Sequence, residues 1–334
     1  MVTEKDFAAL SAMACIPRCH EGAQRRSMRI PQGWSALPEA TSNPEHGGLG
    51  VKAFVNDLGE TVLAMGGLDF MAEAMVASNN AEEFITNLAL DMGLASYTEA
   101  LQRAAHAYAL LRQRTLRQGE DPGPIHFTGH GVGGGMASVM ATWFDQPCTV
   151  FAQAPLRAVA LSPGDFASVL RTVESLLGST DSAVKALQAF IRHPREVLAQ
   201  REQLRVTHWH VRGEIHALLR SPATAIQGTE NAIDIGIQPP SLETALTLHA
   251  MNLHAALLYE PRLSLLCQAS PDLLFLMIDR EEDCDLLETL IHDQHKVGLE
   301  RESALTRFVN GLEWKGEVPA GDVLSSAAAD QADR

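Results

Sequence analysis

A strand, a glycine-rich turn and a helix follow one another without a spacer between residues 125 and 143. The short apolar run Ile125–Thr128 indicates a strand, and the small residues from Met136 to Trp143 indicate a helix. Between them lie five glycines in seven residues, Gly129-His-Gly-Val-Gly-Gly-Gly135. A chain that turns so sharply from strand to helix raises the turn residue above a sheet edge, beside a helix N-terminus. The pattern predicts an α/β fold with a functional site at this turn.

Further strands alternate with helices along the chain. Residues 51–56 and 60–65 indicate a β-hairpin with turn residues at 57–59, and residues 148–152 and 204–211 indicate buried strands. Apolar residues recur at helical spacing between 101 and 111. Strands that alternate with helices predict a mostly parallel, doubly wound sheet flanked by helices.

The length of 334 residues, 46% of them hydrophobic, favours one large domain with insertions. We expect a loop and helical extension over residues 1–50, a core over 51–275, and a C-terminal helical extension and tail over 276–334. Within the core, residues 156–203 show two amphipathic helical patterns. They are expected to form a helical cap over the carboxyl edge of the sheet.

The charge and the distribution of apolar residues disfavour several classes of partner. The net charge of −15 disfavours nucleic acid. The sequence contains no run of 18 apolar residues, so no membrane span is expected. The N-terminus lacks a Sec signal, which favours a cytoplasmic protein or one secreted without a cleaved signal. Cys15, Cys19 and His20 resemble half of a metal site, but no second half completes it, so ordinary thiols are favoured. We expect neither metal nor cofactor, and the oligomeric state is left open.

The elbow and its flanks resemble the class 3 lipases, a fungal-lipase-like group of α/β-hydrolases. That family reads Thr-Gly-His-Ser-Leu-Gly-Gly at the nucleophile elbow, and Thr128–Gly134 matches it except at Gly131 and Val132. Weaker similarity extends from Val51 to Tyr259. A dinucleotide-binding turn is the competing interpretation, but no acidic residue about twenty positions on closes such a unit. The resemblance therefore implies an α/β-hydrolase fold.

The resemblance also implies the residues of a Ser-His-acid site. Gly131 stands where the nucleophilic serine would be, flanked by the elbow residues Gly129, His130 and Gly133. Residues 211–214 are similar to the strand end that presents the catalytic acid, here Glu214, with Asp234 as the alternative. Residues 248–253 are similar to the segment that presents the catalytic histidine, here His249. This chain order is the one expected of α/β-hydrolases. We expect the three positions to meet at the carboxyl edge of the sheet.

The oxyanion hole is implied at the backbone N–H groups of Val132 and Leu68. The family often has a hydroxyl residue at the second position and an arginine before it, where this chain has Leu68 and Gly66. Several departures around one site favour a naturally decayed or repurposed site over a single inactivating substitution at Gly131. Both origins remain open.

Three functions follow as hypotheses. The first is a lipase or phospholipase type of ester hydrolase that is inactive because Gly131 has no hydroxyl. The second is a pseudoenzyme that binds a lipid or a protein partner without turnover. The third is an interaction surface formed by the cap helices, with the pocket filled by side chains. Headgroup and chain length of a lipid or other ester substrate depend on pocket shape and are not determined by these motifs.

Overall fold

The computed structural model describes residues 2–14, 30–42, 50–66, 97–119, 123–236 and 241–269. A seven-stranded sheet has its strands in chain order, β1 to β7. The strands are β1 (Trp34–Ala36), β2 (Val51–Asn56), β3 (Thr61–Met65), β4 (Ile125–His130), β5 (Cys148–Phe151), β6 (Val206–Val211) and β7 (Thr229–Ile233). The first three strands pair antiparallel, and those from β3 to β7 pair parallel. The predicted hairpin and mostly parallel sheet are confirmed.

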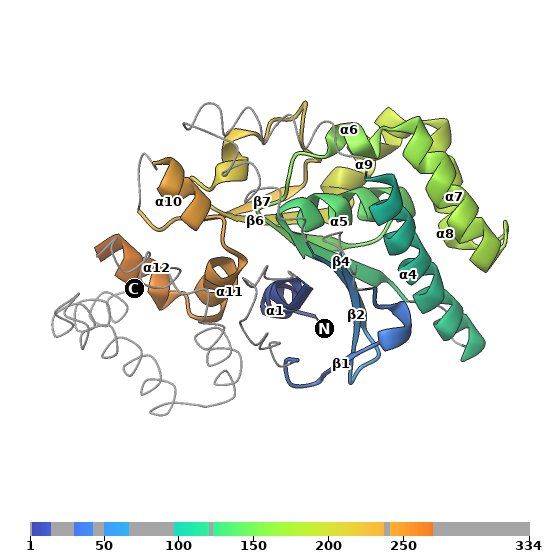
Figure 1. The fold of residues 1–334 in the computed structure, drawn as a ribbon, viewed down its shortest axis with the longest axis horizontal. Coiled ribbons are helices and arrows are strands. Elements are labelled where there is room, and N and C mark those ends of the chain that lie inside the picture. Colours follow the sequence, from blue (N-terminus) through green and yellow to red (C-terminus); the bar gives the residue numbers. More distant parts are fainter. Residues whose placement is uncertain are drawn as a thin grey trace, which may run out of the picture.

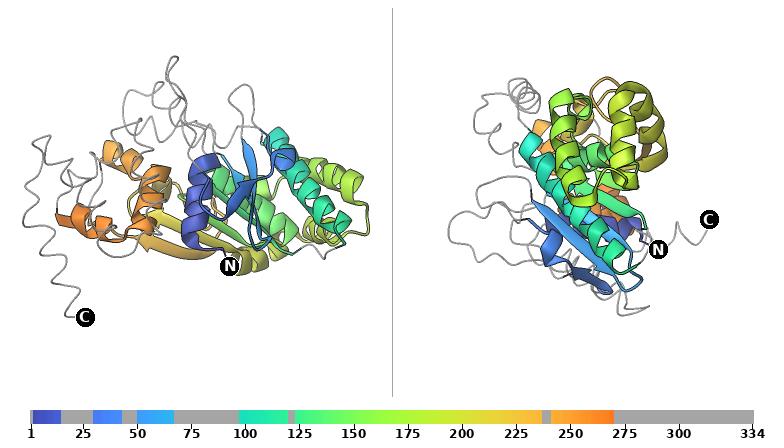
Figure 2. Two further views of the ribbon diagram at one scale, coloured as in Figure 1. Left: turned by 90° about the horizontal axis from the view of Figure 1, so that it is seen from below. Right: turned by 90° about the vertical axis from the view of Figure 1, so that its right-hand side faces the viewer.

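Helices cover both faces of this sheet (Figures 1 and 2). They are α1 (Glu4–Ala14), α4 (Thr98–Arg117), α5 (Gly131–Phe144), α6 (Arg157–Ala160), α7 (Pro163–Leu177), α8 (Ser182–Arg192), α9 (Pro194–Arg205), α10 (Leu242–Thr247), α11 (Met251–Tyr259) and α12 (Arg262–Ala269), with short 3₁₀ helices η1 (Pro38–Ala40) and η2 (Ile215–Leu218). Successive side chains of β3 enter two separate apolar clusters. Leu63 and Met65 pack with α4 and α5, whereas Val62 and Ala64 pack with α1 and α11. Period-two alternation thus builds two cores from one strand.

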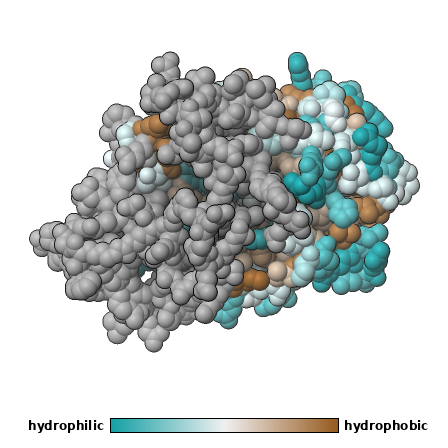
Figure 3. Space-filling view, viewed as in Figure 1, coloured by the Kyte–Doolittle hydropathy of each residue, from teal (hydrophilic) through white to brown (hydrophobic). Residues whose placement is uncertain are grey.

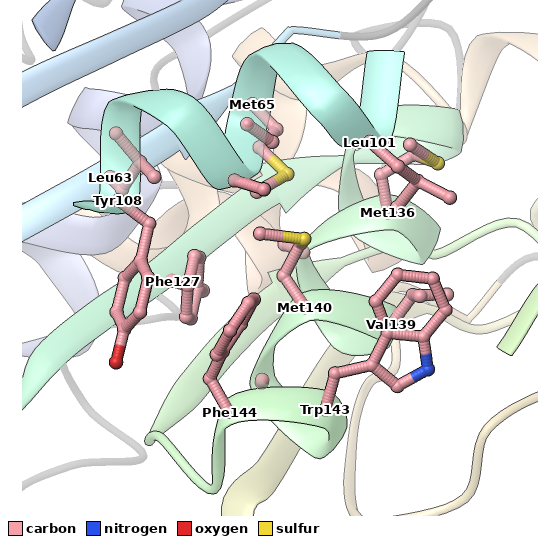
Figure 4. Packing of buried hydrophobic residues seen from close by; sticks show 14 of the residues in the cluster. Leu63, Met65, Leu101, Tyr108, Phe127, Met136, Val139, Met140, Trp143 and Phe144 are labelled. Carbon is pink, nitrogen blue, oxygen red and sulfur yellow. The ribbon is translucent and has the colours of Figure 1, made fainter. Parts of the chain in front are cut away.

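Helix α5 is the centre of the larger core. All fourteen of its residues are buried, and its composition is apolar on every side, as expected of a helix enclosed by other elements. Phe144 packs on Tyr108 of α4, Met140 lies toward Phe127 of β4, and Met136 lies beside Leu101 of α4 (Figure 4). The ring centroids of Tyr108 and Phe144 are 4.5 Å apart. The helix therefore has little freedom to move relative to the strand that precedes it.

Glycine is required where α5 approaches β3. A Cβ on Gly133 would lie 2.2 Å from the carbonyl oxygen of Met65, and one on Gly129 would lie 2.7 Å from backbone atoms of Gly133. Both contacts are with backbone, which cannot move aside as a flexible side chain does. The two glycines let strand and helix meet at a distance that no other residue allows.

We expect Gly133→Ala to lower the free energy of unfolding by about 2 to 3 kcal/mol or more, because the added methyl group overpacks a backbone contact. Gly164→Ala is the matched control, since a Cβ at Gly164, in the first turn of α7, meets nothing within 4 Å. Urea denaturation of the two variants measures the difference. Equal stability of the two would contradict this account of the elbow.

The insertion between β5 and β6 differs from the expected cap. It forms four helices, α6 to α9, where the sequence pattern indicated two. Helix α7 packs against α4, and α6, α8 and α9 pack against α5. The Thr98 hydroxyl of α4 donates a hydrogen bond to the Asp165 carboxylate of α7. Figure 1 places α7 and α8 beside α4, away from α10 and α11. These helices pack against the helical layer, where α4 and α5 match their apolar faces.

The N-terminal segment also differs from expectation. Residues 1–50 were expected to form an extension over the domain, but most residues of α1 are buried where the helix packs against the sheet and α11, and β1 adds an edge strand. Phe7 and Leu10 supply apolar side chains to this second core. Part of this segment therefore belongs to the core. The expected tail over 276–334 lies outside the described residues, as do Cys15, Cys19 and His20.

Large exposed apolar side chains in the described part of the chain are scattered. They are Leu58, Leu116, Leu204 and Leu265. On the face seen in Figure 3, hydrophilic residues predominate over the described surface, with hydrophobic ones dispersed among them. None of the described helices combines the length and the apolar character that a bilayer crossing requires. A mostly parallel sheet between helical layers, with a strand–glycine–helix elbow at its carboxyl edge, is the α/β-hydrolase fold predicted from the sequence.

Candidate active site

The elbow joins β4 directly to α5. His130 ends the strand with extended backbone, and Gly131 begins the helix with φ of +57°. Residues with a Cβ rarely adopt this left-handed conformation, whereas glycine does so freely. The predicted turn is therefore tighter than expected, because the glycines after 131 form the first turns of α5 and not a separate loop.

His249 faces Gly131 from between α10 and α11. A Cβ built on Gly131 would lie 3.2 Å from Nε2 of His249. The other ring nitrogen, Nδ1, is 2.9 Å from Oε2 of Glu214. Because a carboxylate only accepts hydrogen bonds, Nδ1 carries the proton and Nε2 presents a lone pair toward Gly131. The structure thus brings together the three positions that the sequence analysis singled out.

Glu214 is fully buried in the turn that follows β6. Its Oε1 accepts a hydrogen bond from the Arg220 guanidinium, and its Oε2 also accepts one from the backbone N–H of His216 at 2.7 Å. Burial raises the pKa of this carboxyl, but the hydrogen bond from His249 and the Arg220 charge outweigh it and hold the pKa well below its usual range. The carboxylate is therefore ionised at neutral pH and can stabilise an imidazolium at His249.

Asp234, the alternative acid, lies elsewhere. It follows β7, its side chain is 51% exposed, and its Oδ2 is 3.4 Å from Nε of Arg212. Its Oδ1 accepts from the backbone N–H of Gly236. Between the two candidates, only Glu214 contacts the His249 ring.

Three further histidines surround His249, and the sequence analysis did not single out two of them. The ring centroid of His249 lies 4.4 Å from that of His130 and 4.3 Å from that of His216. The ring centroids of His254 and His130 are 5.7 Å apart. Burial lowers the pKa of His216 to about 3 and that of His254 to about 4, and it lowers the pKa of His130 well below its usual value. All three rings are neutral at neutral pH.

His130 and His254 have structural partners on both sides of the site. Nε2 of His130 is 2.5 Å from the carbonyl oxygen of His249, which fixes the backbone of that residue. Nδ1 of His254 is 2.9 Å from the carbonyl oxygen of Ala250, and its Nε2 accepts from the N–H of Val211. No sequence pattern marks His216, His254 or Arg220, because their contacts depend on a tight turn and on a distant helix.

Of the two predicted oxyanion donors, only Val132 lies in the described residues. Val132 is the second residue of α5, so its N–H belongs to the first helical turn, where no intrahelical carbonyl is available to accept it. Leu68 lies outside the described residues.

The same cluster contains atoms that could ligate a metal ion. Within the described ranges, Glu214, His216 and His249 form the one group whose ligand atoms lie within 4.8 Å of one another. Both carboxylate oxygens of Glu214, however, already accept hydrogen bonds from Arg220, His249 and the His216 backbone. This donor set fits a proton relay better than a cation site.

Residues 29–238 match the Tle-like phospholipase domain, a phospholipase-like family. The chain belongs to this family. The Lip2 lipase of Yarrowia lipolytica is similar over 72% of this chain and 80% of that chain, with 12% identity and a TM-score of 0.37. Carboxyl esterase 2 of Tuber melanosporum is similar over 87% and 100%, with 13% identity and a TM-score of 0.32. Among curated proteins, none matches this sequence.

Proposed function

We propose that this phospholipase-like domain carries the acid and base of a Ser-His-acid carboxylic ester hydrolase and lacks its nucleophile. The observation that supports this most directly is the position of a Cβ on Gly131, 3.2 Å from His249 Nε2. A serine hydroxyl extending from that position would lie within hydrogen-bond reach of the ring. Glu214 fixes the tautomer of His249, and the N–H of Val132 faces the developing oxyanion.

The missing hydroxyl defines what this chain cannot do. In the intact mechanism, the serine oxygen attacks the ester carbonyl, His249 takes its proton, and an acyl-enzyme forms. Gly131 has no atom to carry the acyl group. The chain is therefore expected to be inactive by the acyl-enzyme route, with lipid or other esters as the substrate class.

Covalent labelling tests the assignment of position 131. We expect Gly131→Ser to react with a fluorophosphonate probe and to carry the adduct on residue 131 in a peptide map, since His249 and Glu214 activate the new hydroxyl. The unmodified chain and Gly131→Ala are expected to remain unlabelled at this position. An unlabelled Gly131→Ser variant with native circular dichroism would rule out the proposed nucleophile position.

Gly131 itself favours a second candidate, which is binding of a lipid or a protein partner without turnover. A fatty acid could accept a hydrogen bond from the Val132 N–H with one carboxyl oxygen and donate its carboxyl proton to the lone pair of His249 Nε2. Isothermal titration calorimetry of the unmodified chain with palmitate should then show saturable binding, and the His249→Ala variant should bind palmitate more weakly. Unchanged binding in His249→Ala would place any fatty acid outside this site.

A further inference from the structure

Two imidazole nitrogens that accept hydrogen bonds lie beside Gly131. His249 donates its Nδ1–H to Glu214, which leaves Nε2 as an acceptor. His216 Nδ1 is 2.9 Å from the carbonyl oxygen of Ala152, and because a carbonyl only accepts, Nε2 of this ring is also an acceptor. The two ring centroids are 4.3 Å apart, and a Cβ on Gly131 would lie 3.8 Å from Cε1 of His216.

Nε2 of His216 is buried and has no hydrogen-bond partner in the part of the chain that the structure describes. The residue is only 1% exposed. Buried polar atoms nearly always have a partner, and an exception calls for a bound water or ligand. The residue that accepts from the other side of the ring, Ala152, has φ of 42°, which is uncommon for a residue with a Cβ. A backbone held in this conformation at a site suggests that the orientation of His216 has a function.

We propose that His216 and His249 together bind a water molecule beside Gly131, and that this water replaces the serine hydroxyl as the nucleophile. The inference rests on the proposed function of the site as an ester hydrolase. A water molecule has two O–H donors, which match the two imidazole acceptors, and it keeps a lone pair for the ester carbonyl carbon. Glycine favours this arrangement because any larger residue at 131 would place a Cβ against the His249 ring.

The reaction is a single displacement. Water oxygen bonds to the ester carbonyl carbon while His249 Nε2 takes one of its protons, and the carbonyl electron pair moves onto the oxygen that faces the Val132 N–H. The tetrahedral intermediate then expels the alkoxide, which takes the proton back from His249, and the carbonyl bond re-forms. The products are a carboxylic acid and an alcohol. Glu214 stabilises the transient imidazolium, and no acyl group becomes attached to the chain.

Hydrolysis of p-nitrophenyl butyrate by the unmodified chain tests the proposal. We expect slow turnover above the uncatalysed rate, about a hundredfold or more faster than in His249→Ala purified in the same way, because a general base typically contributes this much. No burst of p-nitrophenol and no acyl adduct in the intact mass spectrum are expected. A burst or an adduct would overturn the water route.

His216→Asn separates water binding from a structural role. Asparagine can still donate to the carbonyl oxygen of Ala152, but it has no atom in place of Nε2. We expect the rate of the unmodified chain to fall about fivefold, the effect of one lost hydrogen bond. The acylation rate of Gly131→Ser, measured as kcat/KM, should change less than about twofold, because in that step the serine oxygen attacks the ester and no water is needed.

The outcomes distinguish this inference from the proposed function. If Gly131→Ser hydrolyses the ester but the unmodified chain shows no His249-dependent turnover, the water route fails and the hydrolase site stands. If neither hydrolyses the ester, both fail. If His216→Asn lowers the rate of the unmodified chain and the acylation rate of Gly131→Ser equally, His216 has only a structural role and does not bind the water.

Discussion

Gly131→Ser is expected to raise kcat/KM for p-nitrophenyl butyrate by about a thousandfold or more over the unmodified chain. Removal of the nucleophile from an intact triad costs about six orders of magnitude in rate, and what remains is still about three to four orders faster than the water reaction because of binding and the oxyanion hole. His249 and Glu214 are already joined at 2.9 Å, so the variant has to add only the hydroxyl. Stopped-flow kinetics should also show a burst of p-nitrophenol as the acyl-enzyme forms.

The gain in activity has a cost in stability. Gly131 has φ of +57°, and a Cβ there would approach His249 Nε2 to 3.2 Å, so the imidazole has to move by a few tenths of an ångström. A left-handed residue with a Cβ costs about 1 to 2 kcal/mol, which corresponds to a fall in Tm of a few degrees. Gly131→Ala carries the same Cβ without the hydroxyl. It should lose the same stability and gain no hydrolysis, and equal activity of the two variants would contradict the assignment.

Acidification is expected to unfold the protein between about pH 6.5 and pH 4. His130, His216 and His254 are neutral in the folded protein, with pKa values of about 3 for His216 and about 4 for His254, both lowered by burial. In the unfolded chain each imidazole binds a proton near pH 6.5, so the unfolded state holds more protons below that pH. The free energy of unfolding therefore has its full value above about pH 6.5. It decreases as the pH falls, until the pH reaches the pKa values of the folded state.

The size of this effect is comparable with the whole stability of a domain. His216 and His254 each remove roughly 2 to 3 kcal/mol of stability between pH 6.5 and pH 4.5, against the 5 to 15 kcal/mol typical of a folded protein, and His130 acts in the same direction. Below about pH 4.5, Glu214 acts in the same direction, because its lowered pKa favours the folded state only while the carboxylate is ionised. Urea denaturation at half-unit pH intervals measures the slope. His254→Gln should flatten it by about one proton, and a free energy that stays constant from pH 7 to pH 5 would contradict the account.

Much of the fold could be predicted from the sequence because apolar periodicity determines it directly. The hairpin, β4, β5 and β6 all consist of apolar or alternating runs, and the structure has them where expected. Strand β7 was not predicted, since Thr229–Ile233 is a largely exposed edge strand with little apolar pattern. The burial of α1 also could not be predicted, because amphipathicity indicates that a helix has a buried face and not which surface covers it.

The candidate site was predicted through resemblance more than through chemistry. Spacing along the chain placed Gly131, Glu214 and His249 in the expected order, but nothing in the residues themselves distinguished Glu214 from Asp234. The structure separates them by burial and by their cationic partners, Arg220 and Arg212. The role of His216 was invisible in the sequence, since its ring reaches the site only through the 3₁₀ turn that Glu214 caps.

The packing of α1 has a consequence for synthesis on the ribosome. Ser11 is hydrogen-bonded to Thr128, 117 positions later, and Lys5 reaches the carbonyl oxygen of Tyr259, 254 positions later. At roughly 5 to 20 residues per second, the last of these partners emerges many seconds after α1. Until then, the face of α1 that packs against α11 has no native surface to cover it. This helix is therefore a segment that a nascent-chain chaperone would have a long opportunity to bind.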